Sequence, residues 1–392
     1  MVYPGRDLMS EPIELTSIEF VEIPATVRTT WVMAHLREAG GEGTWVEVVG
    51  DVKQPSVETC TELAAAVATL ARRPIVDEAA VPSMLGLTDT DLCGDFIRAT
   101  AVSSLRSAVS QLQAARAGQS LTEAVGGAPQ DSVQLYGNIN RSLLDDRTPA
   151  AHAAAASATV ERWDFEIIKC APFDEVRAKP GDRSSDILDS AAPGIARICA
   201  AIDAVGDGVR VLVDCHSRFD EASALAIGEK LAELGVSWFE EAVDPGTQVE
   251  ALARIAAATR LPMAGGEGLY GKDRFENLLS TGAVETIMPD VKHCGGVAEA
   301  VRAGRAVAAV GGTISLHSPS GPLSLLASAH ATAAVDGALA LEHAVDEVDW
   351  RAELLVPAEQ IRQGRLWIPA GPGLGASLDE DTIPRRGRRW KP

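Results

Sequence analysis

From residue 133 onward the chain alternates short apolar runs with helical patterns, and no other feature constrains its fold as strongly. Clear helical stretches separate most of the runs, for example at 222–234, 249–258 and 298–310. Repeated strand–helix units predict parallel strands joined by right-handed crossovers. Eight such strands indicate a closed (β/α)8 barrel of the TIM type, which we place at residues 131–350, rather than an open sheet. The predicted strands lie at 133–136, 165–169, 210–213, 237–240, 263–264, 286–288, 313–316 and 339–341.

The residues on either side of this region follow other patterns. Segment 13–130 reads as α+β, with strand-like alternation at 13–23, a second strand at 44–49, and helices at 56–73 and 95–117. Segment 351–392 is rich in turn residues and is not expected to add units to the barrel. A chain of 392 residues is long enough for a barrel and one smaller domain.

The charge of the chain excludes several kinds of partner. It carries 35 Lys and Arg against 55 Asp and Glu, a formal net charge of −20, whereas nucleic acids and anionic membranes are bound by clustered basic residues. The N-terminus lacks the apolar region of a signal peptide, and no stretch of about 18 apolar residues occurs. The six cysteines are widely spaced, which favours reduced thiols. We therefore expect a soluble cytoplasmic protein that binds neither nucleic acid nor membrane.

Three carboxylates follow successive barrel strands of the prediction. Asp214 ends one strand, Glu240 ends the next, and Glu267 follows the third after two glycines. Their spacings of 26 and 27 residues match one strand, one helix and two loops, so the side chains should meet at the carboxyl-terminal rim. Three carboxylates repel one another unless a cation lies between them. Ligation by oxygen alone favours Mg²⁺ over Mn²⁺ or Ca²⁺.

Neighbouring strand ends add candidates for proton transfer. Asp290 ends one strand and His317 ends the next, 27 residues later. A carboxylate beside an imidazole orients the ring and raises its basicity, so His317 is a candidate general base. On the other side of the predicted metal site, Lys169 ends the second strand. His216 lies two residues after Asp214 and would face the same cavity if the strand stayed extended.

Several short motifs stand in barrel order and together resemble the enolase superfamily, in its mandelate racemase-like branch (the mandelate racemase/muconate lactonizing enzyme family). They are VLVD at 211–214, WFEE at 238–241, GGE at 265–267, MPD at 288–290 with a following GG at 295–296, SLH at 315–317, LEH at 341–343 and PAGPGLG at 369–375. The resemblance covers nearly the whole chain. It implies a barrel with an α+β capping domain formed by the N-terminal segment (13–130) and the returning C-terminal tail (351–392).

The same resemblance implies a chemistry. One Mg²⁺ per active site would stabilise an enediolate formed when the α-proton of a small carboxylate substrate is removed. Glu342 matches the carboxylate that ends the eighth strand and would contact substrate. Relatives of this kind are homo-oligomers, so a dimer or an octamer is expected.

Two details of sequence favour one branch of the family, the sugar-acid dehydratases. Many relatives carry Lys-x-Lys at the end of the second strand, whereas this chain has Lys169-Cys170-Ala171, which removes one base of a two-base racemase. The segment Asp214-Cys215-His216 resembles the Asp-x-His motif of sugar-acid dehydratases, where the histidine protonates the departing hydroxyl. We therefore expect loss of water from an acid sugar to give a 2-keto-3-deoxy acid, in carbohydrate catabolism. Lys169 would hold or polarise the substrate carboxylate.

Three alternatives stay open from the sequence. The residues Lys-x-Ala-Pro-Phe at 169–173 depart from the usual sugar-acid pattern and could mark a dehydratase of a cyclic hydroxy amino acid, such as a hydroxyproline. A racemase or cycloisomerase of the same superfamily is the next alternative. The non-enzyme alternative is a degenerate barrel that binds metal or a partner.

Substrate selectivity has the weakest signal in the sequence. By resemblance, a mobile loop near residues 24–31 would close over the substrate, where Arg28 could pair with a distal carboxylate and Trp31 could exclude water. Asn138 follows the first barrel strand and is a candidate ligand for a substrate hydroxyl.

Overall fold

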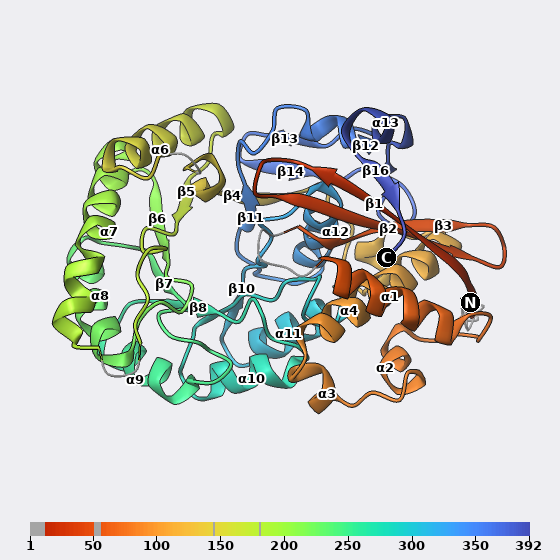
Figure 1. The fold of residues 1–392 in the computed structure, drawn as a ribbon, viewed down its shortest axis with the longest axis horizontal. Helices are drawn as coiled ribbons and strands as arrows, with labels where there is room; N and C mark the ends of the chain where they lie inside the picture. The colour runs from red at the N-terminus through yellow and green to blue at the C-terminus, as the bar shows by residue number, and fades with distance from the viewer. Residues whose placement is uncertain (1–11, 51–55, 144–145, 180–181) are drawn as a thin grey trace, which may run out of the picture.

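The barrel region forms a ring of eight parallel strands in the computed structural model, which describes residues 12–50, 56–143, 146–179 and 182–392 (Figure 1). Each strand pairs in parallel with the next from β4 to β10, and β11 pairs with β4. The amides of Leu339 and Glu342 donate to the carbonyls of Ile314 and Leu316 at 2.8 and 3.3 Å, which closes the ring between β10 and β11. The strands are β4 (Ser132–Asn138), β5 (Ile167–Cys170), β6 (Arg210–Asp214), β7 (Trp238–Glu240), β8 (Met263–Gly265), β9 (Thr286–Ile287), β10 (Thr313–Ile314) and β11 (Leu341–Ala344).

One long helix follows each strand from β4 to β10, and these helices surround the ring (Figure 1). Their sequences show why: in α11 the residues Val297, Ala300, Val301, Gly304 and Val307 are buried, at the i, i+3, i+4, i+7 spacing of one helix face. The helices are α6 (Pro149–Trp163), α7 (Ser184–Val205), α8 (Glu221–Glu233), α9 (Val249–Thr259), α10 (Lys272–Ser280), α11 (Val297–Ala308) and α12 (Pro322–Ala333). The predicted strand–helix alternation is therefore present, although β5 and β11 begin at 167 and 341 instead of 165 and 339.

A layer of mostly apolar side chains lies inside the ring. A separate buried cluster lies there, and its two aromatic rings, Tyr136 and Trp238, meet edge to face with centroids 5.8 Å apart. The remaining members are Ile167, Leu212, Ala264, Met288 and Ala340. Because this floor is apolar, the polar groups of the barrel are confined to its rims.

The N-terminal segment and the end of the chain share one antiparallel sheet of strand order β16-β1-β2-β3, seen as a dark blue strand beside the red ones in Figure 1. Its strands are β1 (Leu15–Pro24), β2 (Thr30–Glu38), β3 (Gly43–Val49) and β16 (Arg388–Trp390). Helices α1 (Ser56–Leu70) and α4 (Phe96–Arg116) contact this sheet. The short helices α2 (Val81–Met84), α3 (Asp89–Cys93), α5 (Leu121–Ala124) and α13 (Ile383–Arg386) complete this part. The tail therefore lies against the N-terminal segment.

The tail also contacts the barrel. β13 (Gln360–Arg362) and β14 (Arg365–Trp367) form a hairpin, and β14 pairs antiparallel with the start of β4. The pair β12 (Leu355–Val356) and β15 (Ser377–Leu378) lies apart from both large sheets. The tail thus adds an antiparallel edge to β4, which the sequence did not lead us to expect, and no further parallel strand.

Among the described residues no helix combines the length and the apolar character that a membrane crossing requires.

Candidate active site

Three carboxylates converge at the carboxyl-terminal rim of the ring. Asp214 ends β6 and Glu240 ends β7, where the two residues are partners in the parallel register. Glu267 follows two residues after β8. Each residue offers one oxygen, and these oxygens all lie within 4.8 Å of one another. Asp214 and Glu240 are buried, whereas the Glu267 side chain is 28% exposed and opens the cluster to solvent.

The donor chemistry of this cluster fits a divalent cation. The Oε2 atom of Glu240 is buried and has no hydrogen-bond partner among the described residues, so it is free to ligate. Burial and the charge of Asp214 raise the pKa of Glu240 well above its usual range. A cation between the carboxylates would offset the repulsion between Asp214 and Glu240 that raises this pKa. Carboxylate oxygens are also the ligands that Mg²⁺ prefers.

Lys169 supplies one positive charge beside the same cluster. Its Nζ atom lies 2.9 Å from Glu240 Oε1, 2.7 Å from Glu342 Oε1 and 3.6 Å from Asp214 Oδ2. The side chain is fully buried, and although burial alone would lower its pKa, the charges of Glu240 and Glu342 raise the pKa of Lys169 well above its usual value. Lys169 is therefore a permanent cation, and one charge does not neutralise three carboxylates.

His317 and Asp290 form a histidine–carboxylate pair beside Glu267. Nδ1 of His317 donates to Asp290 Oδ2 at 2.9 Å, and Nε2 lies 3.1 Å from Glu267 Oε2. Burial alone would lower the pKa of His317, but the charges of Glu267 and Glu342 and the bond to Asp290 raise it to about 9. Because Nδ1 is held by Asp290, the nitrogen that faces the carboxylate cluster is Nε2.

Lys292 binds the carboxylate of Asp290. Its Nζ donates to both carboxylate oxygens of Asp290, at 3.1 and 2.8 Å, and to Ser320 Oγ. The next residue after Ser320, Gly321, donates its amide to Glu47 Oε1 of β3 at 2.6 Å. This chain of contacts connects the N-terminal sheet to the His317 pair.

His216 occupies the other flank of the cluster. Nε2 lies 3.0 Å from Asp214 Oδ2, and Nδ1 lies 2.8 Å from Asp174 Oδ1. The expectation of an extended strand here was wrong: β6 ends at Asp214, and His216 and Ser217 have φ of 46° and 56°. The backbone turns back in the left-handed region. The amide of His216 then donates to Asp214 Oδ1 at 2.9 Å, and the ring lies against the carboxylate cluster.

Glu342, the second residue of β11 and not its last as predicted, lies beside Asn138, the last residue of β4. Asn138 Nδ2 donates to Glu342 Oε1 at 2.6 Å, and Ser318 donates its amide to Glu342 Oε2 at 3.2 Å. Burial would raise the pKa of Glu342, but the charges of Lys169 and His317 lower it. Both side chains are buried, and Asn138 Oδ1 also accepts from the Asn140 amide at 2.9 Å, so Asn138 is engaged with protein groups rather than left open for a substrate hydroxyl.

The segment predicted as a substrate loop connects β1 and β2: residues 25–29 form a turn outside the strands, whereas Thr30 and Trp31 already belong to β2. Trp31 is the second residue of β2 and is fully buried, with its ring against Trp350 (6.0 Å) and under the Arg351 guanidinium (5.4 Å). Trp31 is therefore a core residue with no open face for a substrate. Arg28 lies exposed in the turn between β1 and β2, and its guanidinium has no contact with a rim carboxylate among the described residues.

Three residues outside the predicted set of catalytic and ligand residues belong to this site. Lys292 is 3% exposed and lies against Asp290. Asp174 had no assigned partner and contacts His216. Glu241 is buried beside Glu240, and its Oε1 accepts from the Gly266 amide at 3.0 Å. The only sequence signal for Lys292 was its position two residues after Asp290, which permits a local ion pair.

Sequence relatives are acid-sugar enzymes. A D-xylonate dehydratase of Haloferax volcanii is 30% identical over 263 residues, which span 66% of this chain and 62% of that protein, less than two thirds of its length. A D-galactarolactone cycloisomerase of Agrobacterium fabrum is 26% identical over 295 residues, 72% of this chain and 73% of the relative.

The fold and the family agree with these relatives. A crystal structure of a member of the enolase superfamily from Salmonella Typhimurium superposes with a TM-score of 0.82, at 21% identity, over 96% of this chain and 99% of the other. At that identity the likeness concerns the fold alone. Residues 151–382, more than half of the chain, match the family model of the enolase C-terminal domain-like proteins. The chain therefore belongs to the enolase superfamily, among the mandelate racemase/muconate lactonizing enzymes.

Proposed function

We propose that this protein is a Mg²⁺-dependent dehydratase that removes water from an acid sugar and yields a 2-keto-3-deoxy acid. The observation that carries the proposal is the position of two imidazoles. Nε2 of His317 and Nε2 of His216 contact the carboxylate cluster from its two flanks, at Glu267 and at Asp214. A β-elimination needs both a base for the α-proton and an acid for the departing hydroxyl.

Asp214, Glu240 and Glu267 would hold the metal ion. When bound, Mg²⁺ supplies electrostatic stabilisation of the negative charge that develops on the substrate carboxylate. Lys169, fixed between Glu240 and Glu342, adds a second fixed positive charge at the same place. The xylonate dehydratase relative supports an acid-sugar substrate.

The proton transfers follow from the two histidines. The charge of Glu267, a proposed metal ligand, helps to raise the pKa of His317, so a cation held by Glu267 would lower that pKa and favour the neutral ring. Neutral His317 then takes the α-proton on Nε2, and the electron pair of the Cα–H bond moves into the carboxylate as an enediolate. That pair then forms the Cα–Cβ double bond as the Cβ–O bond breaks, and the leaving hydroxide takes a proton from Nε2 of His216 and departs as water. The enol that remains takes up a proton at C3 and loses the proton of its C2 hydroxyl, which gives the keto acid.

The second candidate is a cycloisomerase of an acid-sugar lactone, which the Agrobacterium relative favours. It begins with the same active-site groups but gives no net loss of water. A dehydratase of a cyclic hydroxy amino acid, motivated by the unusual residues 169–173, stays a prediction.

The test is a substrate screen of the protein with Mg²⁺. A library of mono- and diacid sugars, their lactones, and cis- and trans-hydroxyprolines is incubated with enzyme, and keto acid is detected as its semicarbazone. We expect keto acid from at least one acid sugar, lost with EDTA and lost in His317→Asn. Conversion of a lactone without keto acid would replace the proposal with the cycloisomerase, and activity on hydroxyproline alone would replace the substrate class.

A further inference from the structure

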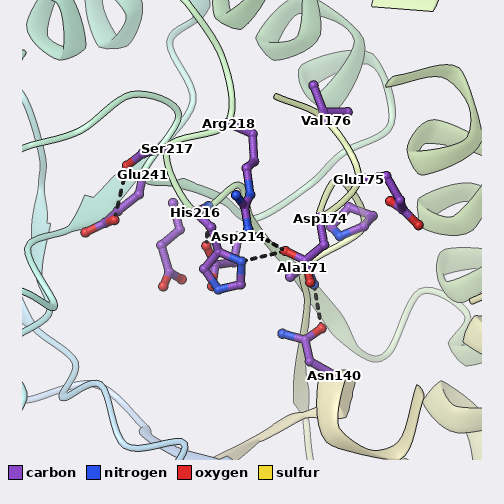
Figure 2. A network of polar contacts seen from close by, with 12 residues as sticks. Asn140, Ala171, Asp174, Glu175, Val176, Asp214, His216, Ser217, Arg218 and Glu241 are labelled. Atoms are coloured by element: carbon purple, nitrogen blue, oxygen red, sulfur yellow. Dashed lines mark hydrogen bonds and ion pairs between the residues drawn. The ribbon is translucent and has the colours of Figure 1, made fainter. Parts of the chain in front are cut away.

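His216 has a second carboxylate partner that lies outside the metal-ligand cluster. Asp174 belongs to the segment after β5, and its Oδ1 accepts from His216 Nδ1 at 2.8 Å while Nε2 of the same ring lies 3.0 Å from Asp214. Figure 2 shows the ring of His216 turned toward Asp174, with the side chain of Arg218 approaching the same carboxylate. Both ring nitrogens of His216 therefore have fixed directions.

We propose that Asp174 is the positioning residue of His216, so that the site holds two histidine–aspartate pairs on opposite flanks of the carboxylate cluster. The inference rests on the proposed function, because it assigns the group that aims the acid of that reaction. The first pair, His317 with Asp290, stands at Glu267. The second pair, His216 with Asp174, stands at Asp214, on the other side of Glu240.

The carboxylate of Asp174 is itself held from outside the cavity. Arg147 Nη1 lies 3.6 Å from Oδ2, and Arg218 Nη2 lies 3.6 Å from Oδ1. Burial alone would raise the pKa of Asp174, but the hydrogen bond and charge of His216 and the charge of Arg147 hold it below its usual range. Asp174 is thus an ionised acceptor, and it cannot give a proton to His216 in this environment.

The backbone before Asp174 is fixed by two further contacts. Asn140 Oδ1 accepts from the amide of Ala171 at 2.6 Å, and the guanidinium of Arg147 donates to the carbonyl of Ala171 (Figure 2 shows the Asn140 contact). Ala171 carries no group that exchanges protons. These contacts hold the loop that places Asp174 beside the His216 ring. The same loop has no side chain at residue 171 that could donate or accept a proton.

The contact with Asp174 determines which ring nitrogen of His216 can act as the acid. Since Nδ1 donates to Asp174, the nitrogen of His216 that can deliver a proton into the cavity is Nε2. Without Asp174 the ring could rotate about χ1 and χ2 or present the other nitrogen. The α-proton, in contrast, is taken by His317, which has its own aspartate. Loss of Asp174 should therefore slow the departure of hydroxide and leave α-proton removal intact.

Asp174→Ala and the matched control Glu175→Ala test this difference. Glu175 pairs with Arg147 and Arg197 but does not contact His216 in the described structure. For an acid sugar converted by the unsubstituted enzyme, kcat for keto-acid formation and the rate of α-proton exchange into D2O are measured on one sample. We expect Asp174→Ala to lower kcat on the order of 100-fold, with KM and exchange changed less than about 3-fold. Asp174→Asn, which keeps an oxygen acceptor for Nδ1, should recover part of the loss, and Glu175→Ala should behave as the unsubstituted enzyme.

Two outcomes would overturn the proposal: an equal fall of exchange and dehydration in Asp174→Ala, which means a structural role, or unchanged dehydration. A measurement without substrate decides the case independently. In protein labelled with ¹⁵N in histidine rings, the Nδ1–H signal of His216, assigned with His216→Gln, should be shifted downfield by its hydrogen bond and should lose that shift in Asp174→Ala. If the unsubstituted enzyme gives no keto acid, the proposed function fails, while a retained ring signal in Asp174→Ala alone refutes the pair.

Discussion

Lys169→Met tests how much the buried carboxylates depend on one cation. The Nζ atom lies 2.7 Å from Glu342 and 2.9 Å from Glu240, and the side chain is fully buried. With an effective dielectric constant of about 20, each contact has a Coulomb energy of about 6 kcal/mol. Most of this offsets the desolvation of the charges, so removal of one partner from such a buried group costs about 3–5 kcal/mol net. The loss of stability cannot exceed the free energy needed to protonate Glu240, whose pKa is already raised well above the usual range.

The assay is thermal unfolding followed by circular dichroism, with EDTA and then with Mg²⁺. At roughly 2 °C per kcal/mol for a large domain, Lys169→Met should unfold about 6–10 °C below the unsubstituted protein in EDTA. Mg²⁺ places positive charge among the same carboxylates, so it should raise the unfolding temperature of Lys169→Met by more than it raises that of the parent. The control is Lys230→Met on the exposed side of α8, which should change the unfolding temperature by about 1 °C or less.

A shift of Lys169→Met in EDTA no larger than that of Lys230→Met would refute the reasoning. It would mean that the carboxylates around Lys169 are already protonated or hydrated, and that the buried lysine does not compensate them. An equal response of both proteins to Mg²⁺ would show that the ion and Lys169 act on different groups.

Three further predictions concern the base, a metal ligand and a buried histidine. His317→Asn should slow exchange of the substrate α-proton on the order of 1,000-fold, with Mg²⁺ affinity by calorimetry nearly unchanged; exchange at the normal rate would show that another group is the base. Glu267→Gln should weaken Mg²⁺ binding at least about 10-fold in the same calorimetric experiment, and equal affinity would remove Glu267 from the ligand set. Burial lowers the pKa of His330 to about 4, although the hydrogen bond from Nε2 to the Leu374 carbonyl acts in the opposite direction. Nδ1 of the same ring accepts from the Thr122 amide. Because the pKa of His330 is lower in the folded protein than in the unfolded chain, the free energy of unfolding is highest above about pH 6.5 and falls by about 3 kcal/mol as the pH drops to about 4. Urea unfolding of His330→Gln should lack this decline. If the variant and the parent declined equally, another group would be responsible for the pH dependence.

The barrel and its rim carboxylates could be predicted because their signals are local and periodic. Asp214 and Glu240 each stand at the last position of an apolar strand, one strand–helix unit apart, and the parallel register then makes them partners. Once the strands were placed, the convergence followed from topology. The predicted cluster of Asp214, Glu240 and Glu267 is present as a group that could hold an ion.

The N-terminal sheet was harder to predict from the sequence, because its strand β2 is buried on both faces. In β2, Trp31 and Met33 belong to the core shared with the barrel, whereas Val32, Ala34 and Leu36 belong to the core under α1 and α4. An apolar strand between two cores has no polar–apolar alternation, so the pattern that identified other strands was absent. That is also why Trp31 was mistaken for a substrate-loop residue.

The groups around the two histidines required the structure itself. His216 reaches the cavity through a left-handed turn and not through strand alternation. Asp174 and Lys292 act through side-chain contacts across a loop, at 2.8 Å to His216 and to Asp290 respectively. No spacing rule predicts such contacts, since loop conformation determines which side chains meet.

The charges of the site explain how a chain with a net charge of −20 could accept an anionic substrate. The rim brings together five carboxylates, namely Asp214, Glu240, Glu267, Asp290 and Glu342. Two lysines, Lys169 and Lys292, compensate two of them. The proposed reaction requires a neutral His317 as base and a charged His216 as acid, which leaves a deficit of two positive charges. A single divalent cation in the carboxylate cluster would balance these groups. Asp174 and Glu241 lie outside this count: Asp174 is paired with Arg147 and Arg218, and burial raises the pKa of Glu241 to about 8. The same count argues against a monovalent ion in this position, because one charge would leave the site anionic and repel the substrate.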